Sequence, residues 1–164
     1  MVEYSKKVMQ HFLKPKNVGE IKDADGIGKV GNITCGDIMH VFIKVKNIKG
    51  KEVISAIKFK TLGCAAAIAT SDVVIDLAKG KTIQDALKIT NKDVVRELGG
   101  LPAIKVHCSL LAEESLGEAI YDYLKKSKKG IPKELEARHK NTLNAEKSFH
   151  EKFKCEGKKW MLKN

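Results

Sequence analysis

Two strand-length runs joined by a tight turn place the strongest constraint on how this chain folds. Residues 38–47 and 53–62 flank the tripeptide Lys49-Gly50-Lys51, and both runs alternate in polarity. Alternation with a period of two is typical of strands that bury only one face. The sequence therefore predicts an antiparallel hairpin, with one face against helices and a lysine-bearing face toward water.

A third strand is expected before this hairpin, over residues 29–34, preceded by an exposed and turn-rich loop over residues 23–31. Strict alternation sorts the last strand into two faces, Ile54, Ala56, Lys58 and Lys60 against Val53, Ser55, Ile57 and Phe59. After Gly63 the period of the pattern becomes helical, so the sheet is expected to end there.

Helices are predicted for most of the remaining chain. They are expected over residues 2–13, 64–79, 82–88, 90–98, 108–126 and 132–154. In the fifth of these the residues expected to face the core are Leu110, Leu111, Leu116, Ile120 and Leu124. The predicted fold class is α+β, with an N-terminal helix, a three-stranded antiparallel sheet, helices packed on one face and an extra C-terminal helical tail. Residues 1–126 form the predicted domain, and residues 127–164 form a basic extension.

Composition restricts the partners and the compartment. The net charge is +11, but Arg96 and Arg138 are the only arginines. Because arginine is the usual residue for bidentate contacts to bases, acidic partners are favoured over sequence-specific nucleic-acid binding. The first ten residues lack the apolar core of a signal peptide, and no run is long enough to span a membrane. We expect a cytoplasmic protein with reduced thiols and no membrane partner.

Three cysteines stand where predicted elements begin or end. Cys35 lies between two strands, whereas Cys64 and Cys108 lie at predicted helix starts, where amide groups favour the thiolate. Asp37 and His107 are close to them in sequence. Three thiolates, one carboxylate and one imidazole would make a mixed ligand set suited to iron–sulfur clusters or Zn²⁺. The sequence thus predicts a single metal site, formed only once the sheet and helices are assembled.

The spacing of the cysteines leaves another interpretation open. Closely spaced cysteine pairs, which are typical of zinc fingers and ribbons, are absent from the sequence. Cys64 could instead be a small core residue, and Asp37 a turn residue. Cys155 is expected to be an incidental thiol of the basic tail. The remaining histidines, at positions 11, 40, 139 and 150, are expected to lie at the surface or in packing contacts.

Four motifs carry a resemblance to a known family. They are YSKKVMQHFLKPKNVG at residues 4–19, CGDIM at 35–39, FKTLGCAAAIATS at 59–71 and LPAIKVHCSLLAEE at 101–114. In this order and spacing the chain resembles the IscU-type scaffolds of iron–sulfur cluster assembly, which also form the N-terminal module of NifU. The resemblance covers about residues 2–126. SufU scaffolds differ by an insertion between the second and third cysteines and by lacking the histidine.

The resemblance implies a function and a ligand set. Cys35, Cys64 and Cys108 would hold a [2Fe–2S] cluster, with Asp37 and His107 as exchanging ligands around it. Cys108 would accept persulfide sulfur, and Asp37 would help to hold incoming Fe²⁺. Zn²⁺ would bind there in the absence of iron. Such a scaffold builds a cluster and passes it to apo-proteins, and it is not an enzyme.

The resemblance also implies partners. They would be a cysteine desulfurase, a ferredoxin as electron donor, apo iron–sulfur proteins and a second copy of the chain. Tyr4 would assist sulfur transfer or pairing of scaffolds. Leu101, Pro102 and Lys105 belong to a chaperone-binding segment that reads LPPVK in the family and LPAIK here. This departure weighs against recruitment of an Hsp70-type chaperone.

Two questions remain open from the sequence. The fourth cluster ligand can be Asp37, His107 or a partner's cysteine, although a durable cluster usually has four thiolates. We expect an exchangeable ligand such as Asp37 to make the cluster labile. The alternative function is that of a zinc-bound sulfur-relay protein, in which Cys108 only passes persulfide sulfur to other acceptors.

Overall fold

The computed structural model describes residues 3–32 and 36–154, and over these it confirms the predicted α+β class. Within this part of the chain, three strands form one antiparallel sheet in the order β1-β2-β3. They are β1 (Gly26–Asn32), β2 (Asp37–Ile48) and β3 (Lys51–Leu62). Ile38 pairs with Leu62, so the start of β2 lies beside the end of β3.

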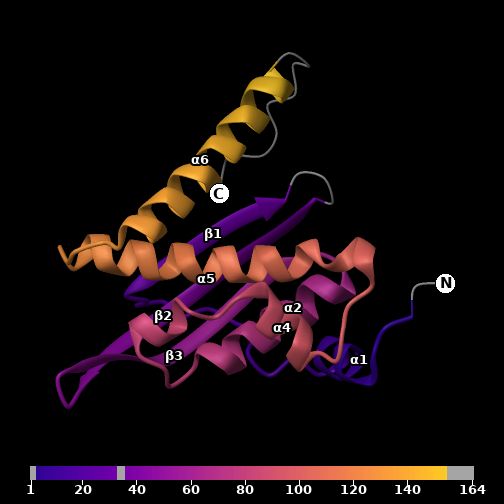
Figure 1. The fold of residues 1–164 in the computed structure, drawn as a ribbon, viewed down its shortest axis with the longest axis horizontal. Helices are drawn as coiled ribbons and strands as arrows, with labels where there is room; N and C mark the ends of the chain where they lie inside the picture. The colour runs from indigo at the N-terminus through magenta and orange to yellow at the C-terminus, as the bar shows by residue number, and fades with distance from the viewer. Residues whose placement is uncertain (1–2, 33–35, 155–164) are drawn as a thin grey trace.

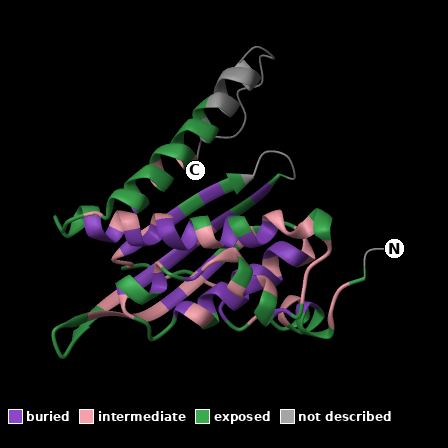
Figure 2. Ribbon diagram, viewed as in Figure 1, coloured by how far each residue is buried: buried purple, intermediate pink, exposed green. Residues whose placement is uncertain are grey.

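The helices gather on one side of the sheet (Figure 1). They are α1 (Lys6–Leu13), α2 (Ala65–Ala78), α3 (Ile83–Ala86), α4 (Asn91–Glu97), the short 3₁₀ helix η1 (Ala103–Lys105), α5 (His107–Lys126) and α6 (Lys133–Lys154). The buried residues of β2, α2 and α5 form one aliphatic core, as Figure 2 shows. Among the described helices, none is long and apolar enough to cross a membrane.

The first strand differs from its prediction. It begins at Gly26, inside the segment expected to be an exposed loop. A β-carbon on Gly28 would overlap the carbonyl oxygen of Ser115, and one on Gly26 that of Ala119, both in α5. The glycines are therefore strand residues that let α5 approach the sheet closely, although in sequence they resemble turn residues.

The prediction that the residues of β3 alternate strictly between the two faces is also wrong. Ile54, which alternation groups with the lysines, has 0% of its surface exposed. Lys44 pairs with Ala56 but Val45 pairs with Ile54, so Ser55 is an extra residue in the ladder. Such a bulge reverses the facing of the residues beyond it. Ile54 consequently shares the buried face with Ile57 and Phe59.

Two helix details also depart from expectation. The first helix begins at Lys6 rather than at residue 2, because the Ser5 hydroxyl accepts a hydrogen bond from the Val8 amide and caps it. Leu110, expected in the core, is 44% exposed. It lies in the first turn of α5, where the helix begins beside the thiols rather than over the centre of the sheet.

The C-terminal tail is helical, as predicted, and its first turns pack on α5. Leu135 is buried in the core, and the Arg138 guanidinium pairs with Glu113 at 3.1 Å. His139 stacks on Tyr121 and bonds through Nδ1 to Glu118 at 2.7 Å. His139 is thus a packing histidine, as expected. Further along, α6 extends away from α5, and its described residues are mostly exposed (Figures 1 and 2).

Candidate functional site

Three elements, β2, α2 and α5, begin at the same corner of the sheet, and each contributes a candidate ligand there. Asp37 is the first residue of β2, and Cys64 is the N-cap of α2, two residues after β3 ends. His107 and Cys108 are the first two residues of α5. Because β2 starts where β3 ends, strand pairing itself brings Asp37 toward Cys64.

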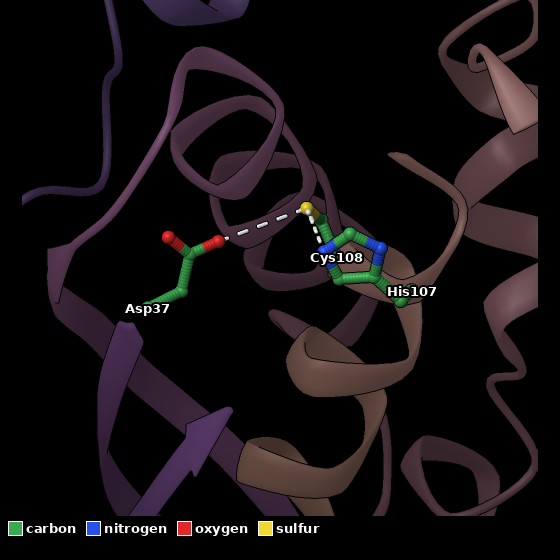
Figure 3. A group of neighbouring side chains, drawn as sticks. All are labelled: Asp37, His107 and Cys108. Atoms are coloured by element: carbon green, nitrogen blue, oxygen red, sulfur yellow. Dashed lines mark hydrogen bonds between the residues drawn. The ribbon is translucent and has the colours of Figure 1, made fainter. Parts of the chain in front are cut away.

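Cys108 lies at the centre of this group. Its Sγ is 3.8 Å from the Cys64 Sγ, 3.8 Å from Asp37 Oδ2 and 3.5 Å from His107 Nε2. Cys64 Sγ is 3.9 Å from the same Asp37 oxygen. Figure 3 shows the Asp37 carboxylate and the His107 ring both directed at the Cys108 sulfur. Ligand atoms of Asp37, His107 and Cys108 all lie within 4.8 Å of one another, close enough to share a metal ion.

The sequence thus predicted correctly that these four residues meet. Cys35 lies outside the described residues, as does Cys155. The alternative, in which Asp37 is only a turn residue, does not fit its position, because its carboxylate is buried and directed at two sulfurs.

Burial at the site is uneven. Cys108 has 0% of its surface exposed and Asp37 4%, whereas Cys64 is partly exposed. Ala66 and Ala67 of α2 pack with Cys108 in a small cluster, bordered by Tyr4 and Leu101. These small side chains allow the two helix starts to approach closely. The inner thiol is therefore shielded, and the outer one faces the surface.

Tyr4 and Lys105 lie close enough to the thiols to interact with them electrostatically. The pKa of Lys105 is raised, chiefly because negative charge on Cys64 stabilises its ammonium group. Burial raises the pKa of Tyr4, and negative charge on Cys64 raises it further, whereas Lys105 opposes the shift. Leu101 and Pro102 are half-buried just before η1. All four residues predicted to bind partners thus lie around the thiols or in the segment leading to them.

Gly63 positions the Asp37 carboxylate, a role that the sequence did not reveal. A β-carbon there would lie 2.9 Å from Asp37 Cγ and 2.9 Å from the Ala67 β-carbon. The glycine appeared in the sequence only as the junction between strand and helix. Its second role, leaving room for the Asp37 carboxylate, depends on a contact between residues 26 positions apart in the chain.

Replacing Gly63 with alanine should displace Asp37 from the thiols. We expect Gly63→Ala to weaken Zn²⁺ binding about tenfold, the usual effect of disturbing the support of a ligand. Titration calorimetry of the metal-free protein measures this. Gly130→Ala is the control, because a β-carbon there meets nothing within 4 Å. Equal affinities in the two variants would contradict the proposed role of Gly63.

A second polar cluster, formed by His11, Asp72 and Asp76, has a structural explanation. Asp72 is fully buried, and its Oδ1 accepts hydrogen bonds from the backbone amides of Lys16 and Asn17 and from the Asn17 side chain, all at 2.9 Å. Its Oδ2 bonds to His11 Nδ1 at 2.7 Å. The carboxylate therefore anchors the segment after α1 to α2. In the sequence, its only signal was that Asp72 is one of two aspartates in a mostly apolar helix.

Comparison with known proteins adds independent information. A family model described as "NifU-like N terminal domain" matches residues 3–130. A protein of Archaeoglobus fulgidus named "Iron-sulfur cluster assembly scaffold protein IscU 1" is 52% identical over 86% of this chain and 94% of its own length. A protein of Aquifex aeolicus named "Iron-sulfur cluster assembly scaffold protein IscU" is 51% identical over 76% of this chain and 78% of its own.

Solved structures share the fold. A SUF-system protein of Fervidobacterium islandicum AW-1 matches with a TM-score of 0.58 and 26% identity, over 71% of this chain and 96% of its own. An N-terminal NifU-like protein of Brucella abortus has a TM-score of 0.54 at 17% identity, covering 74% and 94% of the two chains. At 17% identity, the similarity to the Brucella abortus protein shows the fold alone.

Proposed function

The chain belongs to the NifU-like N-terminal domain family and has the role of an iron–sulfur cluster assembly scaffold, and we propose that it builds a [2Fe–2S] cluster on Cys35, Cys64 and Cys108. The observation that carries this proposal is the meeting of two thiols and a buried carboxylate within 3.9 Å of one another. These donors come from separate elements and face one point. The cluster is cargo, which the scaffold later passes to apo-proteins.

The donor set favours release over storage. The matched region contains three cysteines, whereas clusters that remain in place usually have four thiolate ligands. The fourth position falls to Asp37 or His107. We favour Asp37, because one of its oxygens lies nearly equidistant from the sulfurs of Cys64 and Cys108. A carboxylate binds the iron of an iron–sulfur cluster more weakly than a thiolate does and is readily displaced, so the cluster can leave.

Sulfur would arrive as a persulfide on Cys108, delivered by a cysteine desulfurase. Because Cys108 is fully buried, delivery requires the segment before α5 to move aside. Exposed apolar residues surround this point, Ile104 at 65% and Leu62 at 71% exposure, and they suit a protein partner. A ferredoxin would supply electrons. The protein exchanges ligands and accepts sulfur but turns over no substrate of its own, so it is not an enzyme.

Anaerobic reconstitution with iron, cysteine and a desulfurase tests the proposal. Absorption and Mössbauer spectra should show a [2Fe–2S] cluster in the wild type. They should show none in Cys35→Ser, Cys64→Ser or Cys108→Ser. Asp37→Ala should alter the spectrum and slow transfer to an apo-ferredoxin, because a less exchangeable ligand then takes its place, whereas His107→Ala should leave both unchanged.

Other outcomes would contradict the proposal. A colourless protein that binds one Zn²⁺ and still accepts persulfide would favour the sulfur-relay function instead. An altered spectrum in His107→Ala alone would make the imidazole the fourth ligand. Circular dichroism of each variant, recorded beside the wild type, separates loss of a ligand from loss of the fold.

A further inference from the structure

The sulfurs of Cys64 and Cys108 are close enough to react with each other. Their separation of 3.8 Å is near van der Waals contact, and a disulfide requires about 2.05 Å. Both residues lie at helix starts, Cys64 as the N-cap of α2 and Cys108 as the second residue of α5. Cys64 makes no capping hydrogen bond through its side chain, so α2 does not depend on its sulfur remaining in place.

The thiols of Cys64 and Cys108 differ in how far they are exposed to solvent. Cys108 is fully buried, whereas Cys64 is partly exposed beside it. A sulfur atom added to Cys108 would enter a site bordered by Asp37 and His107.

We propose that Cys64 is the thiolate that releases sulfide from a persulfide on Cys108. The Cys64 sulfur attacks the Sγ of the Cys108 persulfide. The bond between that Sγ and the terminal sulfur breaks, and the terminal sulfur leaves as hydrosulfide with the electron pair. The terminal sulfur keeps the proton that it carried in the persulfide. A Cys64–Cys108 disulfide forms: the Cys64 sulfur is oxidised by one electron, the terminal sulfur is reduced by one electron, and the Cys108 Sγ keeps its oxidation state. The step rests on the proposed function only in taking a persulfide as its starting point.

This step sets the order of events. Cys64 and Cys108 bind no iron while they are joined in a disulfide, so hydrosulfide is made before the cluster is held. Two electrons, which the proposed ferredoxin would supply, then restore both thiolates as cluster ligands. In this proposal Cys64 and Cys108 thus first release hydrosulfide and afterwards bind the cluster iron.

The experiment follows one round of sulfide release without iron. Full-length protein in a chelator is treated anaerobically with glutathione persulfide and desalted, and hydrosulfide is then measured over time. Non-reducing tryptic mapping locates the bonds, because Cys35, Cys64 and Cys108 fall in separate peptides, residues 30–44, 61–79 and 106–125. We expect equal amounts of hydrosulfide and disulfide, with the 61–79 peptide linked to the 106–125 peptide.

Variants identify the attacking thiol. Cys64→Ala should release hydrosulfide at least about tenfold more slowly and keep its persulfide on Cys108, since among the described residues Cys64 supplies the sulfur that lies beside that of Cys108. Cys155→Ala, which removes the one cysteine of the C-terminal tail, should behave as wild type. Release at the wild-type rate from Cys64→Ala, or a disulfide that joins Cys35 to Cys108, would overturn the proposal. The mapping of the wild type needs no variant and is unaffected by any folding defect.

A parallel arm separates this proposal from the scaffold function. Reconstitution with inorganic sulfide in place of the desulfurase requires no persulfide. A cluster formed from sulfide, together with no Cys64–Cys108 disulfide in the iron-free experiment, would overturn the release step and leave the scaffold function standing. Failure of the cluster to form even from sulfide would count against the scaffold function itself.

Discussion

Replacing Gly28 with alanine should lower the free energy of unfolding by about 3 kcal/mol, the upper end of the usual cost of overpacking. The added methyl group would overlap the Ser115 carbonyl oxygen and would lie 3.1 Å from the Glu118 β-carbon. Backbone atoms cannot rotate out of the way as side chains can, so β1 and α5 must separate. For a chain of this length, the midpoint of thermal unfolding should fall by roughly 10 °C.

Gly31→Ala is the matched control, since it lies in the same strand. A β-carbon at Gly31 would meet no atom closer than 3.9 Å, namely the Asp37 carbonyl oxygen. Its unfolding midpoint should stay within a few degrees of wild type, measured by circular dichroism. Equal losses in the two variants would mean that glycine is needed for strand conformation rather than for contact with α5.

Replacing Asp72 with alanine should cost about 4 kcal/mol of folding free energy, because it breaks a buried network around a charge. Two backbone amides, those of Lys16 and Asn17, would lose the carboxylate that accepts their hydrogen bonds. Their segment continues along the sheet edge, where the Phe59 amide donates to the Asn17 carbonyl at 3.0 Å. Denaturant unfolding measures the loss.

Asp76→Ala provides the comparison, because Asp76 lies one turn further along α2. It is exposed and accepts one hydrogen bond from the Asn17 side chain at 2.8 Å. Its loss should cost less than about 1 kcal/mol, the typical net value of such a bond. If Asp76→Ala were as harmful as Asp72→Ala, the anchor would depend on the whole cluster rather than on the buried carboxylate.

Most elements of the fold could be predicted from local patterns. The hairpin around Gly50 and the helices after Gly63 follow from periodicity, which depends on near neighbours in the chain. The errors arose where a distant segment decides the local structure. Gly28 lies in a loop-like sequence, but it pairs with Val41 in the sheet and α5 packs directly against it. Ile54 faces the core because a bulge at Ser55 shifts the ladder, and no residue pattern marked that bulge.

The candidate site divides in the same way. The residue types and their positions at element ends predicted that Asp37, Cys64, His107 and Cys108 would meet, since thiolates at helix starts suit metal chemistry. The types could not give the 3.8 Å between two sulfurs, the burial of one thiol and the exposure of the other, or the space that Gly63 leaves for Asp37. These depend on how α2 and α5 pack against the sheet.

The order of residues along the chain thus determined which elements form and which chemical groups lie at their ends, because hydrogen bonding and hydrophobic periodicity act over a few residues. Packing between α2, α5 and the sheet decided which groups touch, because contacts between segments tens of residues apart follow from close packing of the whole core. The residue types of the candidate site can be read from the sequence. The arrangement that brings the Cys64 sulfur beside that of Cys108 exists only in the folded protein.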